Sequence, residues 1–160
     1  MKRIVSFILV AICVLALAAC AQNATSSEAV ESAQTTQTAL NKWGITLKAE
    51  NVTPSGLTLV CEQSGGENVA ELTTGSSYFL QKSENGQWQD LPYASQDGDI
   101  VWTSEAWIIS MNNITSWDVN WEWLYGQLSA GEYRIGKEIS NFRGPGDYEK
   151  EIAYAYFVIQ

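Results

Sequence analysis

Apolar and polar side chains alternate with a period of two along most of this chain, a pattern that few structures other than a β-sheet accommodate. The clearest run has Trp117, Val119, Trp121 and Trp123 on one side and Ser116, Asp118, Asn120 and Glu122 on the other. Because successive side chains of a strand point to opposite faces, this run predicts a strand with one buried face. We therefore expect Trp121 and Trp123 to lie in a core rather than at a binding site.

Two earlier segments, residues 45–50 and 57–62, show the same alternation on either side of a turn at Pro54-Ser55-Gly56. The second segment places Cys61 in phase with its apolar residues, so the thiol is predicted to face inward. A thiol buried in apolar surroundings has a raised pKa and reacts slowly. We interpret Cys61 as a structural residue.

A hairpin is predicted over residues 78–90, and two registers compete for it. A two-residue Asn85-Gly86 loop pairs Ser83 with Trp88, whereas a three-residue loop ending at Gly86 pairs Lys82 with Trp88. The second register places Trp88 on the same face as Leu80. We favour it because it buries the tryptophan.

The globular part of the chain, residues 42–160, has strand patterns separated by turn residues and no helix of useful length. Further strands are expected near residues 131–135 and 151–160. Seven or eight short strands in about 119 residues are typical of two antiparallel sheets packed together. The predicted fold class is therefore all-β, a two-sheet sandwich.

The N-terminus has the layout of an export signal. Lys2 and Arg3 precede an apolar run over residues 4–19, whose helix would rise roughly 24 Å, short of the ~30 Å hydrocarbon core of a membrane. The run ends in Leu17-Ala18-Ala19-Cys20, which resembles the lipobox of bacterial lipoproteins. That resemblance implies that residues 1–19 are removed, that Cys20 is lipidated and that the domain is anchored on the extracytoplasmic side of the cell membrane. The alternative is a secreted protein in which Cys20 is incidental.

Residues 21–41, which follow Cys20, contain no aromatic residue and are dominated by Ala, Ser, Thr, Gln and Glu. Such a segment buries too little apolar surface to offset the entropy lost on ordering it. We predict that residues 20–41 are a lipidated cysteine and a flexible, disordered tether.

Composition excludes several classes of function. Lys2 and Arg3 leave with the signal, so the nine Lys and Arg fall to seven against eighteen Asp and Glu, and the mature chain repels nucleic acid. The chain has no histidine, which excludes Ser-His-Asp and Cys-His catalysis and histidine metal sites. Cys61 is left without a partner for a disulfide, and no cofactor is expected.

A resemblance to a known family rests on several motifs. Residues 128–133, Leu-Ser-Ala-Gly-Glu-Tyr, have the spacing of a tyrosine corner, in which Tyr133 bonds back to the upstream backbone. The longer stretch 121–135, together with Gly56-Leu57-Thr58-Leu59 and residues 153–157, is similar to a bacterial immunoglobulin-like domain family of exported proteins. The resemblance covers nearly all of residues 44–160. It implies an immunoglobulin-like sandwich and brings no catalytic residues.

Three groups of residues are candidates for a site. Tyr154 and Tyr156 are expected to face outward from the last strand, and Phe142 and Arg143 lie in a predicted loop over residues 141–147. We predict that these four residues form one binding surface, although exposed tyrosines on a strand are also ordinary cross-strand packing. We predict no metal site; Asp97 and Asp99 of an acidic loop, with Glu105 nearby in sequence, are candidates for Ca²⁺, but Asp and Gly are also common turn residues.

These patterns favour a non-catalytic surface lipoprotein whose domain binds or spaces something outside the cytoplasmic membrane. No acidic pair stands in a context that indicates glycoside hydrolysis, so an enzyme is not expected. The alternatives are a carbohydrate-binding module and a lipid-anchored accessory subunit of a transporter, sensor or enzyme. The expected partners are the membrane, through Cys20, and a protein or glycan ligand.

Overall fold

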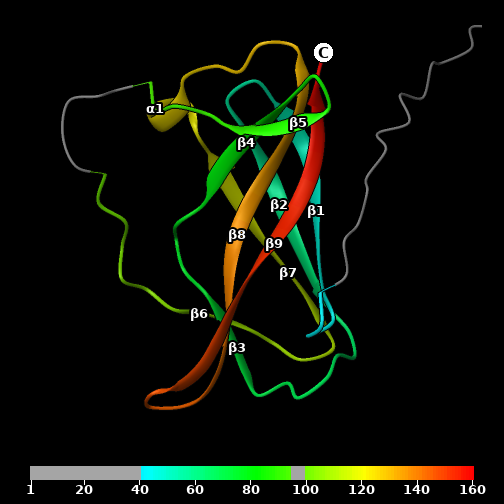
Figure 1. Ribbon diagram of the computed structural model, residues 1–160, viewed down its shortest axis with the longest axis vertical. Helices are drawn as coiled ribbons and strands as arrows, with labels where there is room; N and C mark the ends of the chain where they lie inside the picture. The colour runs from blue at the N-terminus through cyan, green and yellow to red at the C-terminus, as the bar shows by residue number, and fades with distance from the viewer. Residues whose placement is uncertain (1–40, 95–99) are drawn as a thin grey trace, which may run out of the picture. The chain divides into compact units, whose positions relative to one another are not determined.

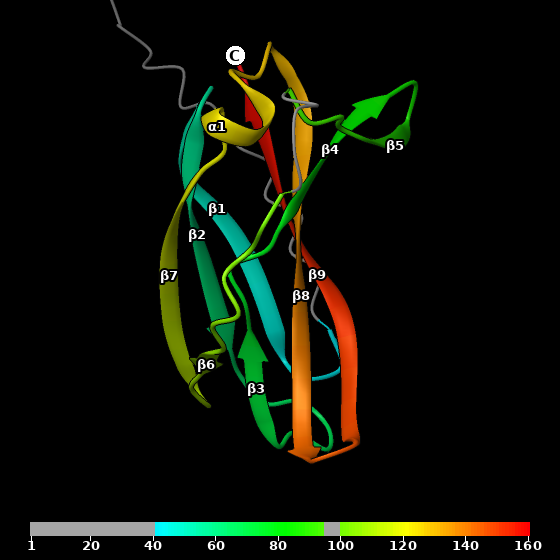
Figure 2. The same cartoon turned by 90° about the vertical axis from the view of Figure 1, so that its left-hand side faces the viewer.

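Two antiparallel sheets pack face to face in the computed structural model, which describes residues 41–94 and 100–160 (Figures 1 and 2). The first sheet has the order β1-β2-β7, formed by Ile45–Thr53, Gly56–Gln63 and Asn113–Asn120. The second has the order β5-β4-β8-β3-β6, with β9 also paired to β8. Its strands are β3 Glu71–Thr74, β4 Phe79–Glu84, β5 Gln87–Asp90, β6 Trp107–Ile109, β8 Gly131–Gly144 and β9 Asp147–Ile159. The predicted all-β sandwich is confirmed.

The second sheet is built around β8. One edge of β8 pairs with β9 along its whole length, from Gly131 opposite Ile159 to Gly144 opposite Asp147. The other edge pairs with β4 near Ile135 and with β3 near Asn141, so that two short strands lie in line along one long one. Between them the chain leaves the sheet over residues 75–78, beside Lys137.

The core lies between the sheets, where the alternating apolar residues predicted from the sequence meet. Cys61 is fully buried, and burial raises the pKa of its thiol to about 12, which fits a structural residue. Trp121 is fully buried and stacks on Phe157, with ring centroids 5.4 Å apart. Lys42, ahead of β1, joins the two sheets through ion pairs of 2.9 Å to Glu149 and 3.0 Å to Glu151 of β9.

The tyrosine corner has the predicted geometry. Tyr133 is 2% exposed near the start of β8, and its hydroxyl donates a hydrogen bond of 2.8 Å to the carbonyl of Ser129. The ring also stacks on Phe157, at 5.7 Å between centroids. Tyr133 therefore ties the segment before β8 to the core.

The favoured hairpin register is wrong. β4 and β5 pair Ser83 with Trp88 through a two-residue loop, in which Asn85 and Gly86 have φ of 52° and 77°. Two positive φ values are what the tight type I′ turn requires, and Asn-Gly is its preferred pair. Turn chemistry therefore decides the register, and Trp88 lies on the sheet face opposite to Leu80.

The expectation that Trp123 lies in the core is also wrong. β7 ends at Asn120, and the one-turn helix α1, Glu122–Tyr125, follows it. The change from strand to helix breaks the period of two, so Trp123 is 58% exposed, and its ring meets that of Trp102 in a T-shaped contact with centroids 5.7 Å apart. No helix among residues 41–94 and 100–160 is long and apolar enough to cross a membrane.

Candidate functional site

An aromatic surface lies on the outer face of the second sheet. We call Phe79, Trp88, Tyr154, Tyr156 and Arg134 the aromatic face; they come from β4, β5, β9 and β8. Tyr154 and Tyr156 point away from the core because Ala153, Ala155 and Phe157, which alternate with them, are buried. Both tyrosines are half-buried, since other members of the face pack against them.

Arg134 is the centre of the aromatic face. Its guanidinium carbon lies 4.7 Å from the centroid of the Trp88 ring and 4.1 Å from that of Tyr154. Its Nε donates a hydrogen bond of 2.6 Å to Oε1 of Gln81, and Nε2 of Gln81 donates one of 2.6 Å to Oδ1 of Asp90. Cation–π contacts and this chain of hydrogen bonds thus hold the face in one arrangement.

Gly136 has no side chain, and this leaves room for the ring of Phe79. Gly136 of β8 pairs with Phe79 on one side and with Tyr154 on the other. A Cβ atom at Gly136 would lie only 2.2 Å from Cζ of Phe79, so the ring lies directly over the glycine backbone. From there it meets the edge of Tyr154, with centroids 6.0 Å apart.

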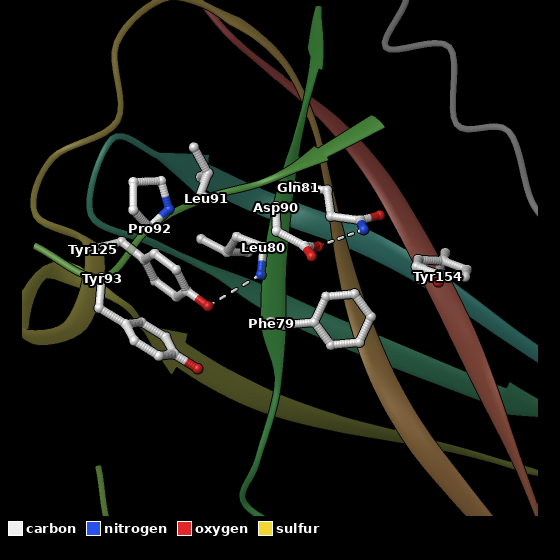
Figure 3. A pocket seen from close by; sticks show the side chains of 9 residues that line it. All are labelled: Phe79, Leu80, Gln81, Asp90, Leu91, Pro92, Tyr93, Tyr125 and Tyr154. Carbon is white, nitrogen blue, oxygen red and sulfur yellow. Dashed lines mark hydrogen bonds between the residues drawn. The ribbon is translucent and has the colours of Figure 1, made fainter. Parts of the chain in front are cut away.

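A pocket of about 530 Å³ opens beside the aromatic face (Figure 3). It is lined by Phe79, Leu80, Gln81, Asp90, Leu91, Pro92, Tyr93, Tyr125 and Tyr154. Figure 3 shows Tyr93 and Tyr125 on one side of it, Phe79 and Tyr154 on the other, and the hydrogen-bonded Gln81 and Asp90 side chains above Phe79. The pocket therefore combines aromatic walls with one amide and one carboxylate.

Tyr125 closes one side of this pocket. Its hydroxyl accepts a hydrogen bond of 3.3 Å from the backbone N–H of Leu80, and its ring lies 5.3 Å from that of Tyr93. Burial raises the pKa of the Tyr125 hydroxyl well above its usual range, so the group stays protonated. It is held by α1 and the edge of β4, whereas Tyr93 is 41% exposed.

The loop predicted over residues 141–147 is wrong, while the binding role of Tyr154, Tyr156, Phe142 and Arg143 stays a prediction. β8 extends to Gly144, so Phe142 and Arg143 belong to a strand rather than to a loop. Gly136 is the strand partner of Tyr154, and Phe142 lies six residues further along β8. At roughly 3.3 Å per residue, Phe142 is therefore about 20 Å from the position opposite Tyr154. Arg143 forms ion pairs of 2.8 Å with Asp147 and 3.3 Å with Glu149, which tie it to the neighbouring strand β9.

Three other predicted residues, Cys20, Asp97 and Asp99, lie outside the described residues. Glu105, close to the acidic loop in sequence, accepts a hydrogen bond of 3.3 Å from the indole N–H of Trp107. Within residues 41–94 and 100–160, no three His, Cys, Asp or Glu side chains are grouped so that they could hold a metal ion.

A buried lysine was not predicted from the sequence. Lys137 of β8 is 2% exposed and points into the sandwich, where its ammonium donates hydrogen bonds to the carbonyls of Gly75 and Ser77. The rings of Trp107 and Trp117 lie 4.9 Å and 5.7 Å from it. Loss of hydration lowers the pKa of Lys137 to about 8. These contacts hold the chain between β3 and β4 and leave the ammonium enclosed, so we interpret Lys137 as structural.

The aromatic face and the pocket were only partly visible in the sequence. Alternation around Ala153 and Ala155 is the signal for Tyr154 and Tyr156. Arg134 and Phe79 carry no such signal, because β4 and β8 are about fifty residues apart in the chain. The pocket depends on the path of residues 91–93 and on α1, which short-range patterns do not specify.

Comparison with known proteins adds one match. A family model described as a bacterial Ig-like domain matches residues 39–155, most of the chain. No curated protein and no solved structure matches this chain.

Proposed function

We propose that this chain, which belongs to the bacterial Ig-like domain family, is a lipid-anchored protein that binds a ligand outside the cytoplasmic membrane without catalysing a reaction. The anchor is Cys20, whose thiol receives diacylglycerol before residues 1–19 are removed and whose new amine is then acylated. Residues 21–41 are the tether between the lipid and the domain. Two or three acyl chains at about 0.8 kcal/mol per buried methylene are enough to hold such a domain at a membrane.

The observation that carries the binding role is the pocket beside the aromatic face. Its volume of about 530 Å³ falls within the range of about 300–1,000 Å³ typical of small-molecule sites, and such sites combine apolar walls with a few polar groups. Phe79, Tyr93 and Tyr154 supply the walls, and Gln81 and Asp90 supply the polar groups. The hydrogen bonds from Arg134 through Gln81 fix the polar groups in advance, which lowers the entropy lost on binding.

The chemistry of the lining supports binding rather than catalysis. Asp90 is the only carboxylate among the described residues that line the pocket, and it is bonded to an amide, whereas hydrolysis of a glycosidic bond requires two carboxyl groups. Tyr125 is kept protonated by its burial and is therefore a donor, not a base. The chain has no histidine to serve as a general base.

The anchor is tested by substitution of one cysteine, with another as the control. We expect the wild-type chain, expressed in a bacterium with a labelled fatty acid, to be labelled and to sediment with membranes. Cys20→Ala should lose the label and be released or remain an uncleaved precursor. Cys13→Ala, which changes a cysteine within the predicted signal, should behave as the wild type. A Cys20→Ala chain of mature length that stays membrane-bound would refute the anchor.

The binding role is tested with small fragments. We expect a general fragment library, screened by ligand-observed NMR against the full chain, to give hits that Tyr93→Ala removes. Tyr148→Ala is the matched control, because Tyr148 is also an exposed tyrosine, 53% accessible, but lies at the far end of β9. A screen with no hits, or hits that both variants affect equally, would refute binding in this pocket.

A further inference from the structure

We infer that the ligand of this pocket is a neutral oligosaccharide, an inference that rests on the proposed binding role. The first reason is the shape of the apolar surface. Phe79, Tyr93 and Tyr154 present flat rings at the pocket, and the C–H face of a pyranose ring packs on such a surface. An aliphatic ligand would have no comparable need for planar walls.

The second reason is the pair of polar groups that line the pocket. Gln81 uses its carbonyl to accept from Arg134 and one N–H to donate to Asp90. This leaves its second amide hydrogen as a donor, next to an Asp90 carboxylate whose Oδ2 is bonded by none of the described residues. A donor and an acceptor side by side match two neighbouring hydroxyl groups, one of which accepts while the other donates.

The third reason is charge, which is balanced at the pocket and favours neither an anionic nor a cationic ligand. The carboxylate of Asp90 and the acidic mature chain repel an anionic ligand. The guanidinium of Arg134, 4.1 Å from the Tyr154 ring centroid, is a fixed positive charge beside the pocket and repels a cationic ligand. The hydrogen-bonded series from Arg134 to Asp90 also offsets the negative charge of the carboxylate. A neutral ligand rich in hydroxyl groups remains.

The fourth reason is that the rings continue beyond the pocket. Tyr154 meets Phe79 at 6.0 Å, and Tyr156 follows at 6.5 Å from Tyr154, so the series runs along β9. A single sugar would occupy the pocket alone, whereas linked sugars would also contact this row. The ligand is therefore an oligosaccharide or the end of a polysaccharide.

The test is isothermal titration of the full chain, in a polyoxyethylene detergent that carries neither sugar nor choline. The probes are cellohexaose, xylohexaose, mannohexaose, maltohexaose and chitohexaose, with hexagalacturonate and choline as charged comparators. We expect at least one neutral hexaose to bind and neither charged compound to do so. Asp90→Asn, which keeps the size of the side chain, should weaken binding about tenfold or more, the loss typical of a hydrogen bond to a charged group.

The control variant and the fragment screen separate the possible outcomes. Tyr93→Ala should also weaken binding about tenfold or more, while Tyr148→Ala should leave the dissociation constant unchanged. Fragment hits in the pocket without binding of any hexaose would overturn the saccharide inference and leave the proposed binding role standing. Choline binding that Tyr93→Ala removes would identify a cationic ligand instead. Hexaose binding that neither Asp90→Asn nor Tyr93→Ala weakens would place the sugar elsewhere and overturn the inference as well.

Discussion

Lys137→Met isolates the effect of a charge held inside the sandwich. Lys137 is 2% exposed, and its ammonium donates hydrogen bonds to two backbone carbonyls and lies against Trp107 and Trp117. Methionine has a similar length and can pack against the same two rings without a charge. The substitution therefore removes the titration of this site and keeps most of its packing.

The magnitude follows from the pKa of Lys137, which burial lowers from 10.5 to about 8. One pKa unit corresponds to about 1.36 kcal/mol, so the charged form costs about 3 kcal/mol in the folded state relative to the unfolded chain. Between pH 8 and pH 10.5 the unfolded chain holds a proton that the folded chain has lost. The contribution of Lys137 to stability therefore rises with pH through this window and is least favourable below pH 8.

The assay is urea denaturation followed by tryptophan fluorescence at pH 7 and at steps up to pH 10.5. We expect the free energy of unfolding of the wild type, relative to Lys137→Met, to rise by about 3 kcal/mol over this range. Ionisation of Cys61 and the tyrosines affects both chains and largely cancels in the difference. Lys150→Met changes an exposed lysine whose pKa Glu138 raises, and it should show no such rise. A difference that stays constant from pH 7 to pH 10.5 would refute the reasoning.

Substitutions at two further positions, Tyr133 and Gly136, test the packing of β8. Tyr133→Phe removes the hydrogen bond to Ser129 and should lower the free energy of unfolding by about 1 kcal/mol, and Tyr133→Ala by about 3–5 kcal/mol; unchanged urea midpoints would contradict the tyrosine corner. Gly136→Ala forces the Phe79 ring off the backbone and should cost about 1–3 kcal/mol in the same measurement, because its Cβ would lie 2.2 Å from Cζ. Combining Gly136→Ala with Phe79→Leu should restore part of the loss, and additive losses would show that the two positions do not compete for space.

The sandwich could be predicted because the alternation of apolar and polar residues within a strand identifies that strand without reference to the rest of the chain. Alternation along residues 45–50, 57–62 and 153–159 depends only on neighbours in the chain, and the structure places those apolar residues in the core. Tyr133 was recognised for a similar reason, since its partner Ser129 is four residues away. Patterns among neighbouring residues were therefore enough to predict the fold class and most of the core.

The errors arose where two local signals competed or where distant strands meet. At residues 85–86 the turn preference of Asn-Gly outweighed the burial of Trp88, which instead packs against Arg134 and Tyr156. At Trp123 a single helical turn interrupted a period that otherwise looked continuous. The pocket combines residues from four parts of the chain, and the pairing of β4 and β9 with β8, together with the position of α1, brings them together.

The arrangement of β1 and β9 has a mechanical consequence for a tethered binding protein. In the lipid-anchored protein that we propose, the tether would lead into β1, while the aromatic face belongs to the other sheet, which shares no strand pairing with β1. A pulling force between an anchored lipid and a bound ligand therefore does not act along one continuous ladder of backbone hydrogen bonds. It crosses from sheet to sheet through the packed core and through the ion pairs of Lys42 with Glu149 and Glu151. The resistance of the domain to extension is thus set by side chains between the layers, and Lys42 lies where the force enters.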